Sequence, residues 1–200
     1  MHNFLITGMG RSGTRFLAET MNLSERWTVG HEPGGPMDAR RQAGEVQKRF
    51  DRNYYGEVNS YLRFYADQIE VEKRGVILRN PIDLWLSITT WHAHKKQRWS
   101  QDLAGMKRAI PHLLKLAESG RYRVILFDRM ISNVEHLRDV FADFGIDDVE
   151  ITEEMLRAKV NAAPAHIKRT TWDSFNAKTW QEIVRLQSMY IEWEWIHGKS

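Results

Sequence analysis

The sequence predicts an α/β fold, a P-loop-type parallel β-sheet sandwiched by helices and followed by a helical C-terminal part. Three short apolar runs, at residues 3–7, 75–78 and 123–127, predict buried parallel strands. Longer segments with helical spacing separate these runs, and strands that alternate with such helices are typical of a parallel sheet covered on both faces. The glycine-rich residues 8–15, directly after the first run, are typical of a strand-to-helix turn in such a sheet.

The expected helices carry apolar side chains at three- and four-residue spacing. They are residues 16–21, 55–71, 81–91, 103–118 and 133–144, a segment opened by Thr152, and a last helix from about Ala177 to Ile196. Pro81 suits a first helical turn with Asn80 as its cap, and Gly120 suits the end of the preceding helix. Residues 27–30 are a weaker fourth strand, and residues 33–36 and 161–175 are expected to be loops.

Length and composition indicate a single domain that spans residues 1–200. The formal net charge is only +3, with 29 basic residues interspersed among 26 acidic ones, so no basic stripe predicts a nucleic-acid partner. The chain has no cysteine, which excludes disulfides and thiolate chemistry. The first strand begins almost at Met1 and no run of about eighteen apolar residues follows, so we expect a soluble, cytoplasmic protein without a membrane anchor.

The glycine-rich loop predicts a site for a phosphate-like anion. Backbone N–H groups and the positive end of the following helix converge there, and Gly10 and Gly13 allow the close approach of a ligand. The ordinary nucleotide P-loop ends in Gly-Lys-Ser/Thr, whereas Thr14 follows Gly13 here and Arg11 is the cation inside the loop. The loop is therefore not expected to bind ATP in the usual way.

In open parallel sheets, ligands lie beyond the carboxyl ends of the strands. Four segments follow the predicted strands and are expected to face one another there, namely residues 8–15, 31–33, 79–87 and 128–129. They bring arginines, hydroxyls and a carboxylate beside a histidine to one edge of the sheet. These groups suit a polyanionic cofactor and the removal of one proton.

The segment that begins at Leu78 makes a family resemblance definite. Arg79 ends a strand, Pro81 follows two residues later, and Ser87 lies eight residues after the arginine. This pattern resembles the 3′-phosphate motif of the sulfotransferase family, and residues 8–15 resemble that family's 5′-phosphosulfate loop. Both motifs occur in the family's order, and the resemblance covers roughly the first 160 residues.

The resemblance implies that the cofactor is 3′-phosphoadenosine 5′-phosphosulfate (PAPS), with 3′,5′-ADP as product, and that its sulfuryl group moves to an acceptor hydroxyl or amine. It implies that Arg11 stabilises charge on the leaving group and that Arg79 and Ser87 hold the 3′-phosphate. The remaining cofactor-binding residues would be Gly10, Ser12, Gly13, Thr14 and Arg15. No metal is required for such a transfer.

The acceptor loses a proton as it attacks, so a base is expected near the sulfur. The segment that starts with His31 and Glu32, before Pro33, is the best-placed candidate. Glu32 is the preferred base and His31 the alternative, and the Glu-Pro pair resembles the carbohydrate-modifying branch of the family. A carbohydrate or another small molecule is thus the expected acceptor.

The chain departs from the family at two places. After the strand near residue 127 it carries Phe127-Asp128-Arg129 rather than a Tyr-Glu-Asp-like string. The glycine-rich basic C-terminal loop is not recognisable either, and Lys168, Arg169 or Trp172 would have to complete the adenine and 3′-phosphate site.

Two other functions remain open at this point. One is a P-loop phosphotransferase that uses ATP and Mg²⁺, because the strand at residues 124–127 followed by Asp128 imitates a magnesium-binding element. Against it stands the missing Lys-Ser/Thr pair at Thr14 and Arg15. The other is a non-catalytic nucleotide-binding module, which would have no need of a base at Glu32.

Overall fold

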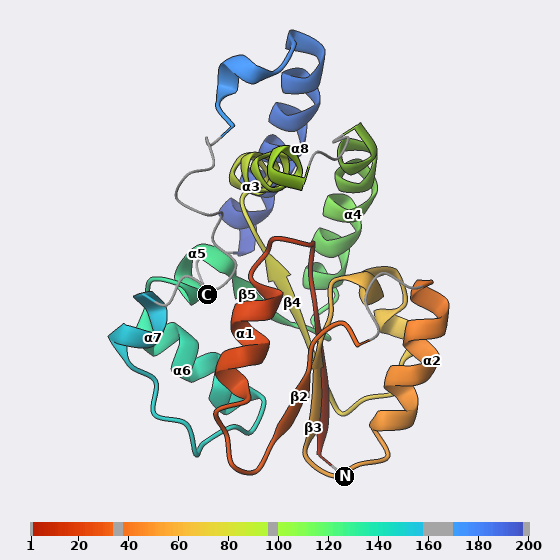
Figure 1. The fold of residues 1–200 in the computed structure, drawn as a ribbon, viewed down its shortest axis with the longest axis vertical. Helices are drawn as coiled ribbons and strands as arrows, with labels where there is room; N and C mark the ends of the chain where they lie inside the picture. Colours follow the sequence, from red (N-terminus) through yellow and green to blue (C-terminus); the bar gives the residue numbers. More distant parts are fainter. Residues whose placement is uncertain (1, 34–37, 96–99, 158–169, 198–200) are drawn as a thin grey trace.

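The computed structural model describes residues 2–33, 38–95, 100–157 and 170–197. Its centre is a five-stranded, entirely parallel sheet with the strand order β2-β3-β1-β4-β5. The strands are β1 (Asn3–Thr7), β2 (Thr28–Gly30), β3 (Tyr55–Val58), β4 (Lys73–Leu78) and β5 (Arg123–Leu126). This confirms the predicted P-loop-type α/β fold (Figure 1).

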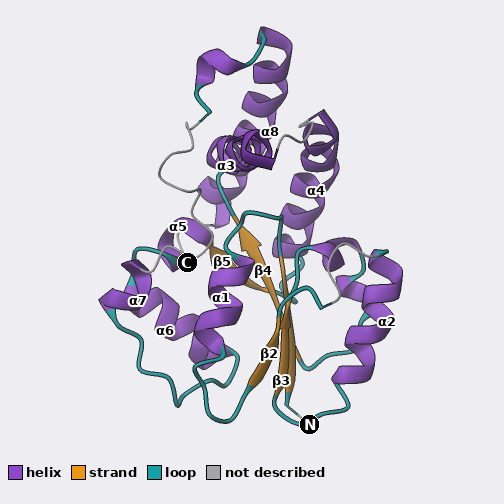
Figure 2. Cartoon of the chain, viewed as in Figure 1, coloured by secondary structure: helices purple, strands orange, loops and turns teal. Residues whose placement is uncertain are grey.

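Helices cover both faces of the sheet (Figure 2). On one face lie α1 (Thr14–Met21), α5 (Phe127–Met130), α6 (Val134–Asp143) and α7 (Glu153–Arg157), and on the other α2 (Ala39–Arg49) and α4 (Ser100–Glu118). Beyond the carboxyl ends of the strands, α3 (Pro81–Lys95) and α8 (Ala177–His197) pack on each other and α8 also packs on α4. The described C-terminal part is thus helical, as predicted.

Side chains along the central strands point alternately to the two faces of the sheet, and this divides the hydrophobic core into two layers. Leu5 faces the layer formed with α2, α4 and α8, whereas its neighbours Phe4 and Ile6 face the layer formed with α1 and α6. Strand β4 repeats the pattern, with Val76 in the first layer and Ile77 in the second. Because a strand buried on both faces needs apolar residues at every position, β1 and β4 were recognisable as continuous apolar runs.

The predicted helix over residues 55–71 is wrong. Residues Tyr55–Val58 form strand β3, and two short 3₁₀ helices follow, η1 (Tyr61–Phe64) and η2 (Ala66–Gln68). Leu62, Ala66 and Ile69 gave the segment its helical spacing, and all three are buried in the core through these turns. Strand β3 carries a buried carboxyl group, Glu57, in place of an apolar side chain, so the sequence shows no apolar run there.

Smaller differences concern element ends. Phe127 starts α5 instead of ending β5, and α2 was not predicted. The Asn80 side chain caps α3 as expected, since its Oδ1 accepts the Ile82 N–H at 3.0 Å. Gly120, after α4, has the expected left-handed backbone with φ of 68°. Among the described residues, no helix combines the length and apolar character needed to span a membrane.

Candidate active site

The loop between β1 and α1 forms a backbone cradle. Gly13, which precedes α1, has a φ of 85°, and Arg11 is also left-handed with a φ of 69°. A Cβ atom on Gly13 would lie 2.7 Å from Met130 Cε and 2.9 Å from the Phe127 ring. Only glycine therefore fits, and none of the described side chains caps the first turn of α1. The N–H groups of that turn suit an anion.

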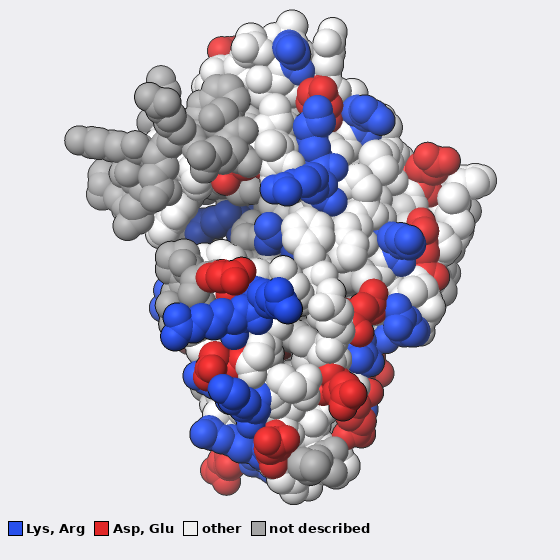
Figure 3. Space-filling model, turned by 90° about the vertical axis from the view of Figure 1, so that its right-hand side faces the viewer, with Lys and Arg blue, Asp and Glu red and all other residues white. Residues whose placement is uncertain are grey.

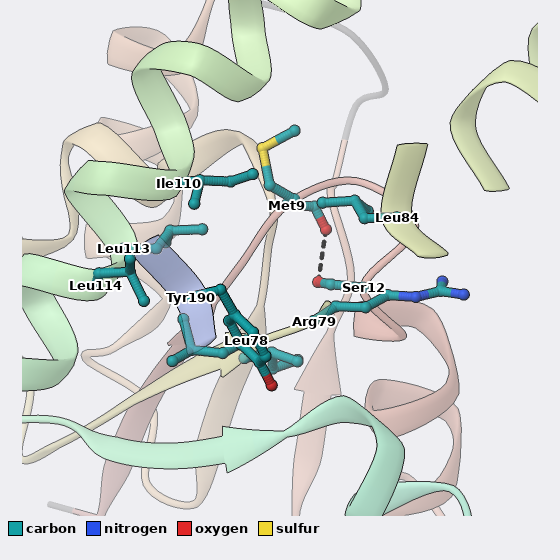
Figure 4. A pocket seen from close by; sticks show the side chains of 10 residues that line it. Met9, Ser12, Leu78, Arg79, Leu84, Ile110, Leu113, Leu114 and Tyr190 are labelled. Carbon is teal, nitrogen blue, oxygen red and sulfur yellow. Dashed lines mark hydrogen bonds between the residues drawn. The ribbon is translucent and has the colours of Figure 1, made fainter. Parts of the chain in front are cut away.

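Met9 fixes the loop to the core. Its side chain is buried and contributes to a cavity of about 10 Å³ under the loop, lined also by Leu84, Ile110 and Tyr190. A space of this size holds at most about one water molecule. Figure 4 shows the stem of Arg79 along this cavity, with its guanidinium directed away from it. The cavity is thus packing space beneath the loop and too small for a nucleotide.

Arg11 connects the loop to α3. Its Nε donates to Ser87 Oγ at 3.3 Å, and its guanidinium stacks over the Trp91 ring at 4.7 Å from the centroid. Burial lowers the pKa of Arg11 from its usual value. A cation removed from water in this way interacts more strongly with an anion than one on the open surface.

Arg79, at the end of β4, lies beside Arg11. Its Nη1 donates to the Arg11 carbonyl oxygen, and its guanidinium stacks on Phe127 with 4.0 Å between Cζ and the ring centroid. Its Nε is buried and has no hydrogen-bond partner among the described residues. Burial lowers the pKa of Arg79, whereas the carboxyl groups of Asp128 and Asp83 raise it. The two motifs, distant in sequence, thus form one basic cluster at the loop.

His31 and Glu32 follow β2, and His31 lies beside the first turn of α1. His31 Nε2 is 3.3 Å from Thr14 Oγ1 and 3.9 Å from Glu32 Oε1. Glu32 has a left-handed backbone with φ of 48°, and its Oε1 accepts hydrogen bonds from Ser60 N at 3.2 Å and from Ser60 Oγ. Burial lowers the pKa of His31, and the neighbouring Glu32 raises it.

The other predicted site residues have distinct surroundings. Ser12 is buried, and its hydroxyl donates to Met9 O at 2.6 Å, so that proton is engaged inside the loop. Arg15 is exposed on α1 and pairs with Glu19, Nε to Oε1 at 2.5 Å. Gly10 belongs to the turn closed by the Ser12 N–H to Met9 O hydrogen bond. Lys168 and Arg169 lie outside the described residues, as does the side chain of Trp172.

Several residues of the site were missed in the sequence. Ser60, which holds the Glu32 carboxylate, and Arg63, whose Nη1 donates to Ser60 O, both follow β3. Because this segment was interpreted as a helix, no strand end pointed to them. Trp91 was assigned only to the α3 helix, and nothing in its spacing indicated the stacking on Arg11.

Positive charge is visible on the neighbouring surface. Figure 3 shows Lys and Arg side chains gathered around a hollow at mid-height of the face that α2 and α4 present. Within the described residues, no three His, Asp or Glu side chains gather closely enough to hold a metal ion. The carboxyl group of Asp128 is near Arg79 and Asp83, and burial raises its pKa. Asp128 thus offsets the charge of Arg79.

Comparisons with solved structures place the fold in a structural class. No protein-family model and no curated protein sequence matches the chain. A sulfotransferase from Alicyclobacillus acidocaldarius superposes with a TM-score of 0.60 at 17% identity, covering 100% of this chain and 97% of its own. The mouse sulfotransferase SULT7A1, complexed with PAP, superposes with a TM-score of 0.58 at 13% identity, over 92% of this chain and 82% of its own. The sulfotransferase domain of the Synechococcus PCC 7002 olefin synthase gives 0.57 at 12% identity, over 94% of each chain. The chain therefore has the sulfotransferase fold.

Proposed function

We propose that this protein is a sulfotransferase that moves the sulfuryl group of PAPS to the hydroxyl of a small-molecule or carbohydrate acceptor. One observation carries the proposal: Arg79 donates to the backbone of Arg11, and Arg11 donates to Ser87. A strand end, a helix and the glycine-rich loop thereby form one basic site of the kind that a nucleotide with phosphates at both the 3′ and 5′ positions requires.

The residues present fit such a nucleotide. Among the described residues, no side chain caps the first turn of α1, so its N–H groups can bind an anion, and the buried Nε of Arg79 lacks a partner. The backbone of residues 10–14 would hold the 5′-phosphate, and Arg79 with Ser87 the 3′-phosphate. When bound, PAPS supplies an activated sulfuryl group joined to phosphate through an oxygen.

Arg11 is assigned to the charge that develops during transfer. Its side chain is half-buried, oriented by Ser87 and by Trp91, and belongs to the loop that would surround the phosphosulfate. A preorganised cation in a dry site stabilises developing negative charge without reorganisation.

Glu32 is assigned to the acceptor proton. Among the described residues, the hydrogen bonds that its carboxylate accepts go to Oε1, so Oε2 is the atom we assign to proton transfer. His31 is the alternative base. Its lowered pKa favours the neutral ring, which can accept a proton at neutral pH.

The experiment measures 3′,5′-ADP release from PAPS, without added metal, over a panel of sugars, phenols and alcohols. We expect release that depends on an acceptor. Glu32→Gln is expected to lower kcat by about 10²- to 10⁴-fold with unchanged affinity for 3′,5′-ADP, because only proton transfer is lost. Glu135→Gln, on the exposed side of α6, is the matched control.

Three results would contradict parts of this assignment. Full activity of Glu32→Gln together with loss in His31→Gln would make His31 the base. Affinity for 3′,5′-ADP without transfer to any acceptor would favour a non-catalytic nucleotide-binding module. Binding of ATP with Mg²⁺ but not of 3′,5′-ADP would remove the sulfotransferase assignment altogether.

A further inference from the structure

A fully buried carboxyl group lies beneath the His31–Glu32 segment. Glu57, in β3, has 0% exposure and pairs in register with Gly30 of β2. A Cβ atom on Gly30 would collide with Glu57 Oε2 and with the Tyr55 hydroxyl. The end of β2 thus has a glycine where the carboxyl group needs the space, directly before His31 and Glu32.

The two oxygens of Glu57 have different partners. Oε1 accepts the backbone N–H of Glu32 at 3.2 Å and the side-chain amide of Asn59 at 2.8 Å. Oε2 accepts the Tyr55 hydroxyl at 2.8 Å. A buried polar group with several partners is costly to remove, because each partner is then left unsatisfied.

Oε1 joins the two segments that meet at the Glu32 side chain. On one side it holds the Glu32 N–H, in the left-handed backbone that a glutamate rarely adopts. On the other it holds Asn59, and the next residue, Ser60, donates to Glu32 Oε1. Glu57, Glu32, Ser60 and Asn59 thus form a closed ring of hydrogen bonds and one peptide link.

We propose that Glu57 is a positioning residue that sets the orientation of the Glu32 carboxylate through this ring. The inference rests on the proposed role of Glu32 as the base. Glu57 itself is sealed from solvent and accepts a hydrogen bond from the Glu32 backbone, so it acts through Glu32 and not on the acceptor. A base displaced by about 1 Å can lose about 100-fold in rate.

The test compares three substitutions. Glu57→Leu removes both contacts of Oε1 and is expected to lower kcat by about 100-fold with unchanged affinity for 3′,5′-ADP. Glu57→Gln can keep an oxygen at the Oε1 position and is expected to restore most of that rate. Tyr55→Phe, the matched control, removes the donor to Oε2 and the acceptor of Arg49 Nη1 but leaves both contacts of Oε1, and its rate should stay within about threefold of the wild type.

A double-mutant cycle separates positioning from general damage. If Glu57 acts through Glu32, then Glu57→Leu has no further effect on kcat in a Glu32→Ala background. An additional large loss in that background would overturn the inference, as would a Glu57→Gln variant as slow as Glu57→Leu.

Amide hydrogen exchange gives a readout that needs no acceptor. The Glu32 amide should be protected in the wild type and in Glu57→Gln, and should exchange at least about tenfold faster in Glu57→Leu. If Glu57→Leu does not fold, the wild type and Glu57→Gln provide the test: protection of the Glu32 amide in both supports the positioning role. An unprotected Glu32 amide in the folded wild type overturns the positioning role, whereas failure of the wild type to bind 3′,5′-ADP overturns only the proposed function.

Discussion

Substitution of Arg79 by alanine is expected to weaken binding of a nucleotide with a 3′-phosphate much more than binding of one without it. The wild-type Arg79 side chain is half-buried and stacked on Phe127, and its buried Nε has no partner among the described residues. A hydrogen bond between charged groups contributes about 1.5–3 kcal/mol. At about 1.4 kcal/mol for each factor of ten, Arg79→Ala should weaken 3′,5′-ADP by about 10- to 150-fold.

The same substitution should change the affinity for 5′-AMP little, because this nucleotide has no 3′-phosphate. Arg79 also donates to the Arg11 carbonyl, but the buried Met9 and the Ser12 N–H hydrogen bond still hold the loop. A loss of about 0.5 kcal/mol, or about twofold, is therefore expected for 5′-AMP. Isothermal titration of both nucleotides measures the difference. Arg123→Ala, at an ion pair with Asp143 on the sheet edge, is the control and should change neither affinity. Equal losses for both nucleotides in Arg79→Ala would refute the 3′-phosphate assignment.

Three further outcomes are expected. Gly13→Ala should lower the free energy of unfolding by about 2–4 kcal/mol, because the left-handed backbone and the contacts with Met130 and Phe127 both oppose a Cβ atom. A free energy of unfolding within about 1 kcal/mol of the wild type, from thermal unfolding, would contradict the claim that only glycine fits there. Arg11→Ala should lower kcat by about 10²- to 10³-fold, more than it lowers 3′,5′-ADP affinity, as steady-state kinetics and titration can show. Burial raises the pKa of Glu57 above its usual 4.5, so its stabilising contribution is complete below that pH and is lost as the pH rises through the folded-state pKa. Urea unfolding should therefore show wild type losing stability relative to Glu57→Gln as the pH rises from about 4 toward neutral, and a relative gain would contradict this sign.

The sequence predicted those parts of the fold whose signal is local. Strands β1 and β4 are continuous apolar runs because helices cover both of their faces, and Gly13 marks a turn that only glycine can make. Strand β3 escaped prediction because its buried positions include Gly56 and Glu57, whose fit depends on partners elsewhere in the chain. A buried carboxyl group satisfied by long-range hydrogen bonds leaves no periodic pattern.

The candidate site likewise contains residues with a local sequence signal and residues without one. Arg11, Arg79 and Ser87 were predicted because their motifs are short and follow strand ends, and the structure brings their side chains together. Ser60 and Glu57 were missed, since their relation to Glu32 exists only once β2 and β3 pair. The orientation of the proposed base is thus a tertiary property, even though the residue itself was recognised in the sequence.

Thermal unfolding with nucleotides tests the central claim most directly. A ligand at about 100 times its Kd stabilises the folded state by about 2.7 kcal/mol. For a chain of 200 residues this corresponds to a rise in Tm of about 5–11 °C. We predict that 3′,5′-ADP produces this rise in the presence of EDTA, and that Arg79→Ala abolishes most of it. A rise with ATP and Mg²⁺ but none with 3′,5′-ADP would contradict the proposed sulfotransferase function.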